Sequence, residues 1–132
     1  MQARRLDRVA GAVSGPAGPA WRALCGLDDI PEGGSRGFPP APGGFIGLFA
    51  VRRGGCVFVY VNACPHVGTP LDWAPDRFLT VDGERIVCAT HGAEFGIEDG
   101  MCVHGPCLGD RLESVISEIK NGVVLVPGDA GL

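Results

Sequence analysis

Apolar residues in this chain come in short runs, and each run ends at a glycine, a proline or a short polar pair. Helical spacing of apolar residues is almost absent, so the pattern predicts strands joined by turns. Residues 21–25 predict a first strand. Residues 45–51 and 56–61 predict a hairpin, because Gly54 and Gly55 between them can take the positive φ angles of a tight turn.

Two more hairpins are predicted further along the chain. Each has a frequent turn pair between two predicted strands: residues 77–81 and 85–88 around Asp82–Gly83, and residues 112–119 and 123–126 around Asn121–Gly122. Residues 112–119 alternate between apolar and polar, although Ile116 breaks the strict alternation. Residues 31–44 contain four of the eleven prolines and five glycines, which predicts a loop.

Together these elements predict an all-β fold, an antiparallel sandwich with a small subdomain that carries the Cys64–His66 and Cys88–His91 loops. A chain of 132 residues is long enough for one domain with a real core. We expect that domain to span residues 21–128. Residues 1–20 have no convincing apolar segment and are interrupted by glycine and proline, so we expect a flexible N-terminal tail.

Charge and cysteine content restrict the function. The formal net charge of −4 argues against nucleic-acid binding and mildly favours a basic docking partner. No run of 18 apolar residues is present, so we expect no membrane span. The six cysteines are scattered, and two lie beside histidines at metal-binding spacing. This usage favours a reducing compartment over a secreted disulfide scaffold, and we expect a cytoplasmic protein.

Two short motifs are the candidate metal site. Cys64-Pro65-His66 and Cys88-Ala89-Thr90-His91 are separated by 21 residues, 67 to 87. Two thiolates and two imidazoles suit a centre that takes one soft and one nitrogen ligand from each loop. Such a set also matches a closed tetrahedral zinc site, so the spacing alone leaves zinc open. A second Cys-x-His sequence, Cys102 to His104, competes with Cys64 and His66 for the ligand role.

The residues around the motifs resemble the Rieske family. The chain reads NACPHVGTPLDW and then CATHGAEFGIEDGMCVHGPCLGDRL, which contain C-x-H-x-G, C-x-x-H-G and a later Gly105–Pro106 followed by Leu112. The resemblance extends from about Trp21 to about Pro127. It implies a [2Fe–2S] cluster whose irons are bound by Cys64 and Cys88 on one side and by His66 and His91 on the other. It also implies that the Gly105–Pro106 loop covers the cluster and that His104 is not a ligand.

Four positions indicate which branch of the family the chain resembles. The high-potential branch has a disulfide cysteine in each ligand loop, where this chain has Thr69 and Thr90. That branch also has a serine and a tyrosine where this chain has Ala93 and Phe95, which cannot donate side-chain hydrogen bonds to the cluster. The sequence therefore resembles the soluble ferredoxin-type branch.

The resemblance implies an electron-transfer protein rather than an enzyme. We expect it to take electrons from a flavin-dependent reductase and pass them to a terminal oxygenase or a similar acceptor. Two other functions stay open: a small electron-transfer subunit of a larger redox enzyme, and a zinc-stabilised binding module. An oxygenase catalytic subunit would need a further iron-binding domain, for which the chain is too short.

The remaining cysteines and two aromatic residues have structural interpretations. We expect Cys25, Cys56, Cys102 and Cys107 to be small buried apolar residues, with a Cys102–Cys107 disulfide as a less favoured alternative. Trp73 and Phe78 are expected to pack beside the ligand loops.

Overall fold

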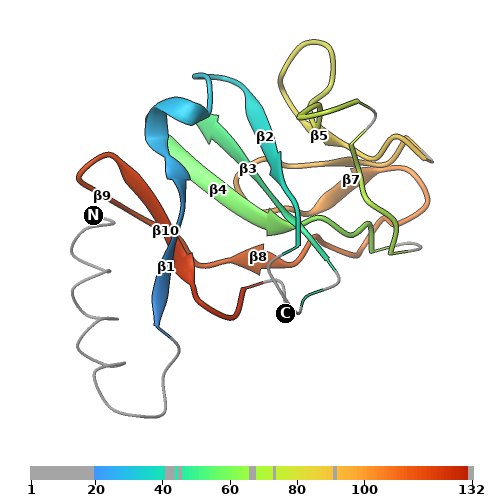
Figure 1. Ribbon diagram of the computed structural model, residues 1–132. Helices are drawn as coiled ribbons and strands as arrows, with labels where there is room; N and C mark the ends of the chain where they lie inside the picture. The colour runs from blue at the N-terminus through green and yellow to red at the C-terminus, as the bar shows by residue number, and fades with distance from the viewer. Residues whose placement is uncertain are drawn as a thin grey trace.

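A computed structural model describes residues 20–40, 44, 46–65, 68–72, 74–90 and 92–130. This part of the chain forms three antiparallel sheets and one short 3₁₀ turn, Leu27–Asp29 (Figure 1). The strands are β1 Trp21–Gly26, β2 Ser35–Phe38, β3 Leu48–Arg53, β4 Cys56–Val61, β5 Ile86–Val87, β6 Glu94–Phe95, β7 Cys102–His104, β8 Ser114–Val115, β9 Glu118–Lys120 and β10 Val123–Pro127. The predicted all-β antiparallel architecture is confirmed. The described residues contain no helix that is long and apolar enough to cross a membrane.

The central sheet is ordered β2-β3-β4-β8, and its middle strands β3 and β4 are buried on both faces. Along β3, Leu48 and Ala50 pack into one apolar cluster, and Phe49 and Val51 pack into another. This division follows from the period of two along a strand. Burial on both faces also explains why β3 and β4 are almost continuously apolar rather than alternating.

The second sheet, ordered β1-β10-β9, covers one face of the central sheet. Val124 and Val126 of β10 share a cluster with Leu48 and Ala50 of the central sheet. Trp21 at the start of β1 pairs with Pro127 at the end of β10, so the first and last described strands are neighbours. The two sheets form the predicted sandwich.

The third sheet, ordered β5-β6-β7, forms the small subdomain over the other face of the central sheet. Phe78 joins the two parts. Its ring is fully buried and stacks on Phe49 of β3, with 4.4 Å between ring centroids and 4° between ring planes. The packing role predicted for Phe78 is confirmed, whereas Trp73 lies outside the described residues.

Two of the predicted tight turns have the expected backbone. Gly54 and Gly55 between β3 and β4 have φ angles of 60° and 81°. Asn121 and Gly122 between β9 and β10 have φ angles of 53° and 75°. Both central residues of each turn are therefore in the left-handed region, as a type I′ hairpin turn requires.

The chain turns back at Asp82–Gly83 as predicted, but residues 77–81 do not form a strand: Leu79 pairs with Ile86 in an isolated bridge, and β5 pairs with β6 instead. Thr80 N–H donates to the Arg85 carbonyl at 2.8 Å, and of the turn pair only Gly83 has a positive φ angle, 73°. The Asp82 carboxylate accepts hydrogen bonds from the Thr80 hydroxyl at 2.6 Å and from Glu84 N–H at 3.0 Å. These side-chain contacts stabilise a wider loop than the two-residue turn of the prediction.

Residues 31–44 are not all loop, because they contain strand β2. This edge strand pairs with β3, for example Arg36 with Ala50. Asp76, from a distant part of the chain, also accepts a hydrogen bond from Gly37 N–H at 2.9 Å. The prediction was wrong because both partners are remote in sequence, while the nearby Pro39 and Pro40 favoured a loop.

The predicted strand 112–119 is divided in two. Val115 of β8 pairs with Val59 in the central sheet, and Glu118 of β9 pairs with Leu125 in the second sheet. Between them Ile116 is exposed at 56%. The chain therefore crosses from one sheet to the other where the alternation of apolar and polar residues breaks.

Candidate metal centre

The first candidate ligand loop follows β4 and is closed by two backbone hydrogen bonds. Cys64 N–H donates to the carbonyl of Thr69 at 2.8 Å, and Gly68 N–H donates to the carbonyl of Cys64 at 2.6 Å. Gly68 has a φ angle of 78°, which an L-residue with a side chain rarely adopts. The glycine thus allows the chain to turn back over the Cys64 carbonyl.

The second loop follows β5 and repeats this arrangement. Cys88 N–H donates to the carbonyl of Ala93 at 2.8 Å, and Gly92 N–H donates to the carbonyl of Cys88 at 2.8 Å. Gly92 has a φ angle of 71°. The Cys-x-His and Cys-x-x-His spacings differ, but each loop places its glycine four residues after its cysteine. The two cysteines therefore occupy equivalent positions in two loops that are closed by the same pair of backbone hydrogen bonds.

The two loops bring both cysteines into one apolar cluster. Cys64 is 1% exposed and Cys88 is fully buried, and both belong to the cluster that contains Phe49 and Phe78. Thiols shielded from water in this way suit a centre that must be protected from solvent. His66 and His91, the other two predicted ligands, lie outside the described residues. Within the described ranges, no three His, Cys, Asp or Glu side chains are grouped as a metal site.

A [2Fe–2S] cluster fits the residues that the structure describes. The paired loops each supply one buried thiol, and both thiols lie in the same apolar cluster. The buried hydroxyl oxygen of Thr69, in the first loop, has no hydrogen-bond partner among the described residues. A buried hydroxyl group without a hydrogen-bond partner lowers the stability of the fold, and a hydrogen-bond acceptor bound in the loop would provide that partner.

The Gly105–Pro106 segment lies against the second loop. Gly105 has a φ angle of 104°, and a Cβ atom at this position would lie 2.8 Å from the Cα of Ala93. The absence of a side chain therefore permits direct contact between the two backbones. This places the third segment beside the candidate centre.

A thiol group near the site was not foreseen from the sequence. Cys102 and Cys107 are both buried, and their Sγ atoms are 3.3 Å apart with Cys102 as donor. Cys107 and Cys64 are both buried in the same apolar cluster. Burial raises the pKa of Cys107 to about 12, with further contributions from the thiols of Cys102 and Cys64. Only the proximity of Cys102 and Cys107 in sequence pointed to their contact.

The other cysteines are free thiols, and the second Cys-x-His sequence has a buried cysteine, Cys102, and an exposed histidine, His104. All six cysteines are free, so the alternative of a Cys102–Cys107 disulfide is not realised. Cys25 and Cys56 are half-buried rather than fully buried. His104 is exposed at the end of β7, and its carbonyl oxygen is 3.4 Å from the Cys102 Sγ. Cys102 thus contacts Cys107 and the backbone of His104.

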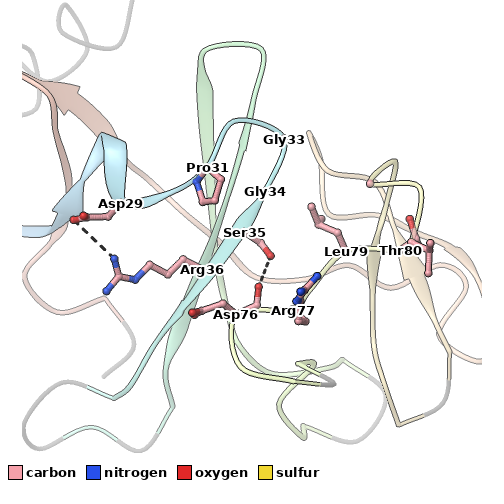
Figure 2. A pocket seen from close by; sticks show the side chains of 12 residues that line it. Asp29, Pro31, Gly33, Gly34, Ser35, Arg36, Asp76, Arg77, Leu79 and Thr80 are labelled. Atoms are coloured by element: carbon pink, nitrogen blue, oxygen red, sulfur yellow. Dashed lines mark hydrogen bonds and ion pairs between the residues drawn. The ribbon is translucent and has the colours of Figure 1, made fainter.

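A surface hollow lies between β2 and the segment that leads into β5 (Figure 2). In it the Ser35 hydroxyl donates to the Asp76 carbonyl at 2.8 Å, and Arg36 faces Asp29 at 3.9 Å. No cysteine or histidine is found among its lining residues, which are Asp29, Pro31, Gly33, Gly34, Ser35, Arg36, Asp76, Arg77, Leu79, Thr80, Val81 and Gly83. The hollow is therefore separate from the candidate metal centre.

Solved structures with the same fold include ferredoxins of dioxygenase systems. One is a chain of the complex of reduced oxygenase and oxidised ferredoxin in carbazole 1,9a-dioxygenase, with 28% identity, a TM-score of 0.67, and coverage of 85% of this chain and 96% of that one. The ferredoxin of carbazole 1,9a-dioxygenase from Nocardioides aromaticivorans IC177 has 21% identity and a TM-score of 0.66, covering 82% and 97%. The ferredoxin of Sphingomonas yanoikuyae B1 has 24% identity and a TM-score of 0.65, covering 82% and 98%.

The extent of these matches differs between classes of protein. The terminal oxygenase of carbazole 1,9a-dioxygenase from Nocardioides aromaticivorans IC177 also shares the fold, but only 32% of its chain is covered. A search of curated proteins found no match.

The Rieske [2Fe–2S] domain matches this chain over residues 20–120. These domains carry a [2Fe–2S] cluster and transfer electrons, which resolves the choice between iron–sulfur and zinc. Since the match spans most of its length, the chain belongs to the Rieske [2Fe–2S] domain family.

Proposed function

We propose that this protein is a one-electron carrier that takes electrons from a flavin-dependent reductase and passes them to a terminal oxygenase or a similar acceptor. The observation that carries this proposal is the extent of the structural match. The chain covers 96–98% of three similar chains, of which two are ferredoxins and one belongs to an oxygenase–ferredoxin complex. A small stand-alone carrier would have this extent, whereas an oxygenase chain is about three times longer.

The ligand division forms part of the proposal. Cys64 and Cys88 would bind one iron, and His66 and His91 the other. The cluster supplies a site for one electron, and two neutral imidazoles in place of two thiolates leave the oxidised site neutral rather than doubly negative. The buried loops support this division, because each presents one thiol to the same apolar cluster.

The protein itself supplies a shielded and fixed environment. Leu71 and Phe95 are fully buried in the same cluster as the two cysteines. Their packing excludes water from the thiols and lowers the local dielectric constant, so charges and dipoles near the sulfurs act more strongly on the added electron. We also place the protein in the cytoplasm, since six free cysteines are consistent with a reducing compartment.

Metal analysis and redox titration test the proposal. Protein purified without oxygen should contain iron and acid-labile sulfide in equal amounts and should take up one electron per cluster. The isolated chain should be reduced by NADH in the presence of a separate flavin-dependent reductase. Stoichiometric zinc without sulfide would overturn the cofactor, and a cluster that is reduced only within a larger enzyme would overturn the carrier role.

A further inference from the structure

Cys102 and Cys107 are free thiols whose sulfur atoms are already in contact. The two Sγ atoms lie 3.3 Å apart, and a disulfide bond requires about 2.05 Å. Small rotations of the two side chains can close this gap of about 1.3 Å. The structure therefore holds the reduced form of a pair that is placed for disulfide formation.

Backbone hydrogen bonds keep the two cysteines together. Cys102 N–H donates to the carbonyl of Asp110 at 2.9 Å, and Asp110 N–H donates to the carbonyl of Cys107 at 2.9 Å. These bonds fold the chain that leaves β7 back against the start of that strand. The contact between the two sulfurs is thus set by the fold of this segment, and a disulfide would join residues that are already neighbours.

The two thiols differ in how a small oxidant can reach them. Both are buried, but Cys107 lies in a turn between exposed Pro106 and Leu108, and Leu108 is 65% exposed. The Leu108 N–H reaches the Gly105 carbonyl only at 3.4 Å, a long hydrogen bond that local opening breaks readily. Cys102 is held in β7 by pairing with β6. Opening of the turn therefore exposes Cys107 first and leaves Cys102 to complete the reaction.

We propose that Cys102 and Cys107 form a reversible disulfide by exchange with a small disulfide such as oxidised glutathione, and that this bond holds the Gly105–Pro106 segment against the second ligand loop. The Cys107 thiolate attacks one sulfur of the oxidant and expels one glutathione thiolate. The Cys102 thiolate then attacks the Cys107 sulfur and expels the second. The two protons of the protein thiols pass to the two glutathione thiolates, so two thiols are oxidised and one disulfide is reduced.

The position of Gly105 explains the effect on the candidate centre. Gly105 lies between the two cysteines in the chain, and its backbone contacts Ala93, whose carbonyl accepts the hydrogen bond of Cys88 N–H. A bond across this short loop makes opening of the segment rarer, so solvent reaches the buried ligand loop less often. The effect on a cluster rests on the proposed function, whereas formation of the disulfide does not.

Peptide mass mapping of the wild-type protein tests the bond. Cleavage after Glu98 and Glu113 releases residues 99–113, which contain Cys102 and Cys107 and no other cysteine. Cluster-loaded protein is incubated with oxidised glutathione without oxygen, and the remaining thiols are alkylated in denaturant. This peptide should carry no alkyl group and be lighter by two hydrogen atoms, and dithiothreitol should restore both thiols. Two alkylated cysteines, or glutathione retained on Cys107, would overturn the proposal.

Transfer of iron to a chelator tests the effect on the centre. It should be roughly tenfold slower in the oxidised than in the reduced wild type, because the closed loop disfavours opening. In Cys102→Ser the rate should not respond to oxidised glutathione. The matched control Cys56→Ser removes a half-buried thiol of β4 and should keep the full response. Equal rates in oxidised and reduced wild type would refute the hold on the ligand loop.

Failure of the proposed function would be visible separately. Iron and sulfide are measured before oxidation, and a wild-type protein without either would contradict the electron-carrier role. The mass of residues 99–113 would still decide whether the disulfide forms, since the contact between Cys102 and Cys107 belongs to the protein alone.

Discussion

Ala89 donates its backbone N–H to the carbonyl of Leu71 across 3.0 Å, which joins the second ligand loop directly to the chain that leaves the first. Ala89 immediately follows Cys88, and Leu71 is fully buried in the cluster that contains Cys64. The relative position of the two cysteines is therefore fixed by protein contacts as well as by any metal. A bound cluster completes an arrangement that the backbone already holds.

Removal of a histidine ligand should abolish normal cluster assembly. His66→Ala and His91→Ala each remove a direct bond to one iron, whereas the cysteine positions persist through the backbone contacts of the loops. His104→Ala should keep the cluster, since we place His104 outside the ligand set. Iron and sulfide content with visible circular dichroism will show this. Loss of iron in His104→Ala together with retention in His66→Ala would reverse the assignment.

Gly105→Ala should weaken the contact between the third segment and the second loop. The new Cβ would lie 2.8 Å from the Cα of Ala93, at a backbone φ of 104°. We expect a loss of stability of about 1–3 kcal/mol from the backbone conformation alone, and more from the steric overlap. The measurement is the urea concentration at which the cluster absorbance is lost.

Gly109→Ala is the matched control for this variant. Gly109 has a φ angle of 94°, but a Cβ there would meet nothing within 4 Å. It should therefore show the conformational cost without the overlap and lose its cluster at a higher urea concentration than Gly105→Ala. Equal midpoints for the two variants would show that contact with Ala93 contributes nothing to stability.

The elements that the sequence predicted correctly are those whose determinants are local. Gly54–Gly55 and Asn121–Gly122 set their turns through their own backbone preferences, so the flanking strands could be placed from the sequence. Strand β2 depends on β3 and on Asp76, neither of which is near it in sequence. Its own residues contain a glycine and lie beside two prolines, so the local pattern favoured a loop.

The candidate site likewise combines local features, which the sequence predicts, with contacts between remote residues, which it does not. The two Cys–His motifs and their glycines are local and were recognisable by spacing. The sequence did not reveal that Gly68 and Gly92 make equivalent hydrogen bonds, because the two motifs differ by one residue in their Cys-to-His spacing. The hydrogen bond from Ala89 N–H to the Leu71 carbonyl joins two loops that are separate in the sequence, and only the folded protein brings them together.

Tyr60 should make the protein less stable in alkali. It is the only tyrosine, and its buried hydroxyl donates to the Ile97 carbonyl at 2.6 Å. Burial raises the pKa of Tyr60 above its ordinary value of 10.0, and the carboxylates of Asp99 and Glu98 raise it further. Because its pKa is higher in the folded than in the unfolded chain, Tyr60 contributes to the free energy of unfolding. This contribution is complete below pH 10 and is lost as the pH rises above 10, because the unfolded chain ionises first.

The variant Tyr60→Phe separates the hydroxyl from the ring. At neutral pH it should lose about 1–2 kcal/mol with the hydrogen bond, but its stability should fall less steeply above pH 10. Denaturant midpoints over this pH range give the two slopes, and the absorbance of the single phenolate gives the titration directly. Identical slopes for wild type and variant, or a tyrosine that ionises near pH 10 in the folded protein, would contradict the prediction.

Ala93 and Phe95 should keep the reduction potential in the lower part of the Rieske range, nearer about −150 mV than +300 mV. Both residues are fully buried in the cluster that contains Cys64 and Cys88, so no water takes the place of the missing donors. The double variant Ala93→Ser with Phe95→Tyr adds two hydroxyl groups there. If each new hydrogen bond favours the reduced state by roughly 1–2 kcal/mol, the potential should rise by about 40–90 mV per bond. Protein-film voltammetry of both proteins decides the matter. A wild-type potential well above zero, or an unchanged potential in a double variant with an intact cluster, would show that other groups set its value.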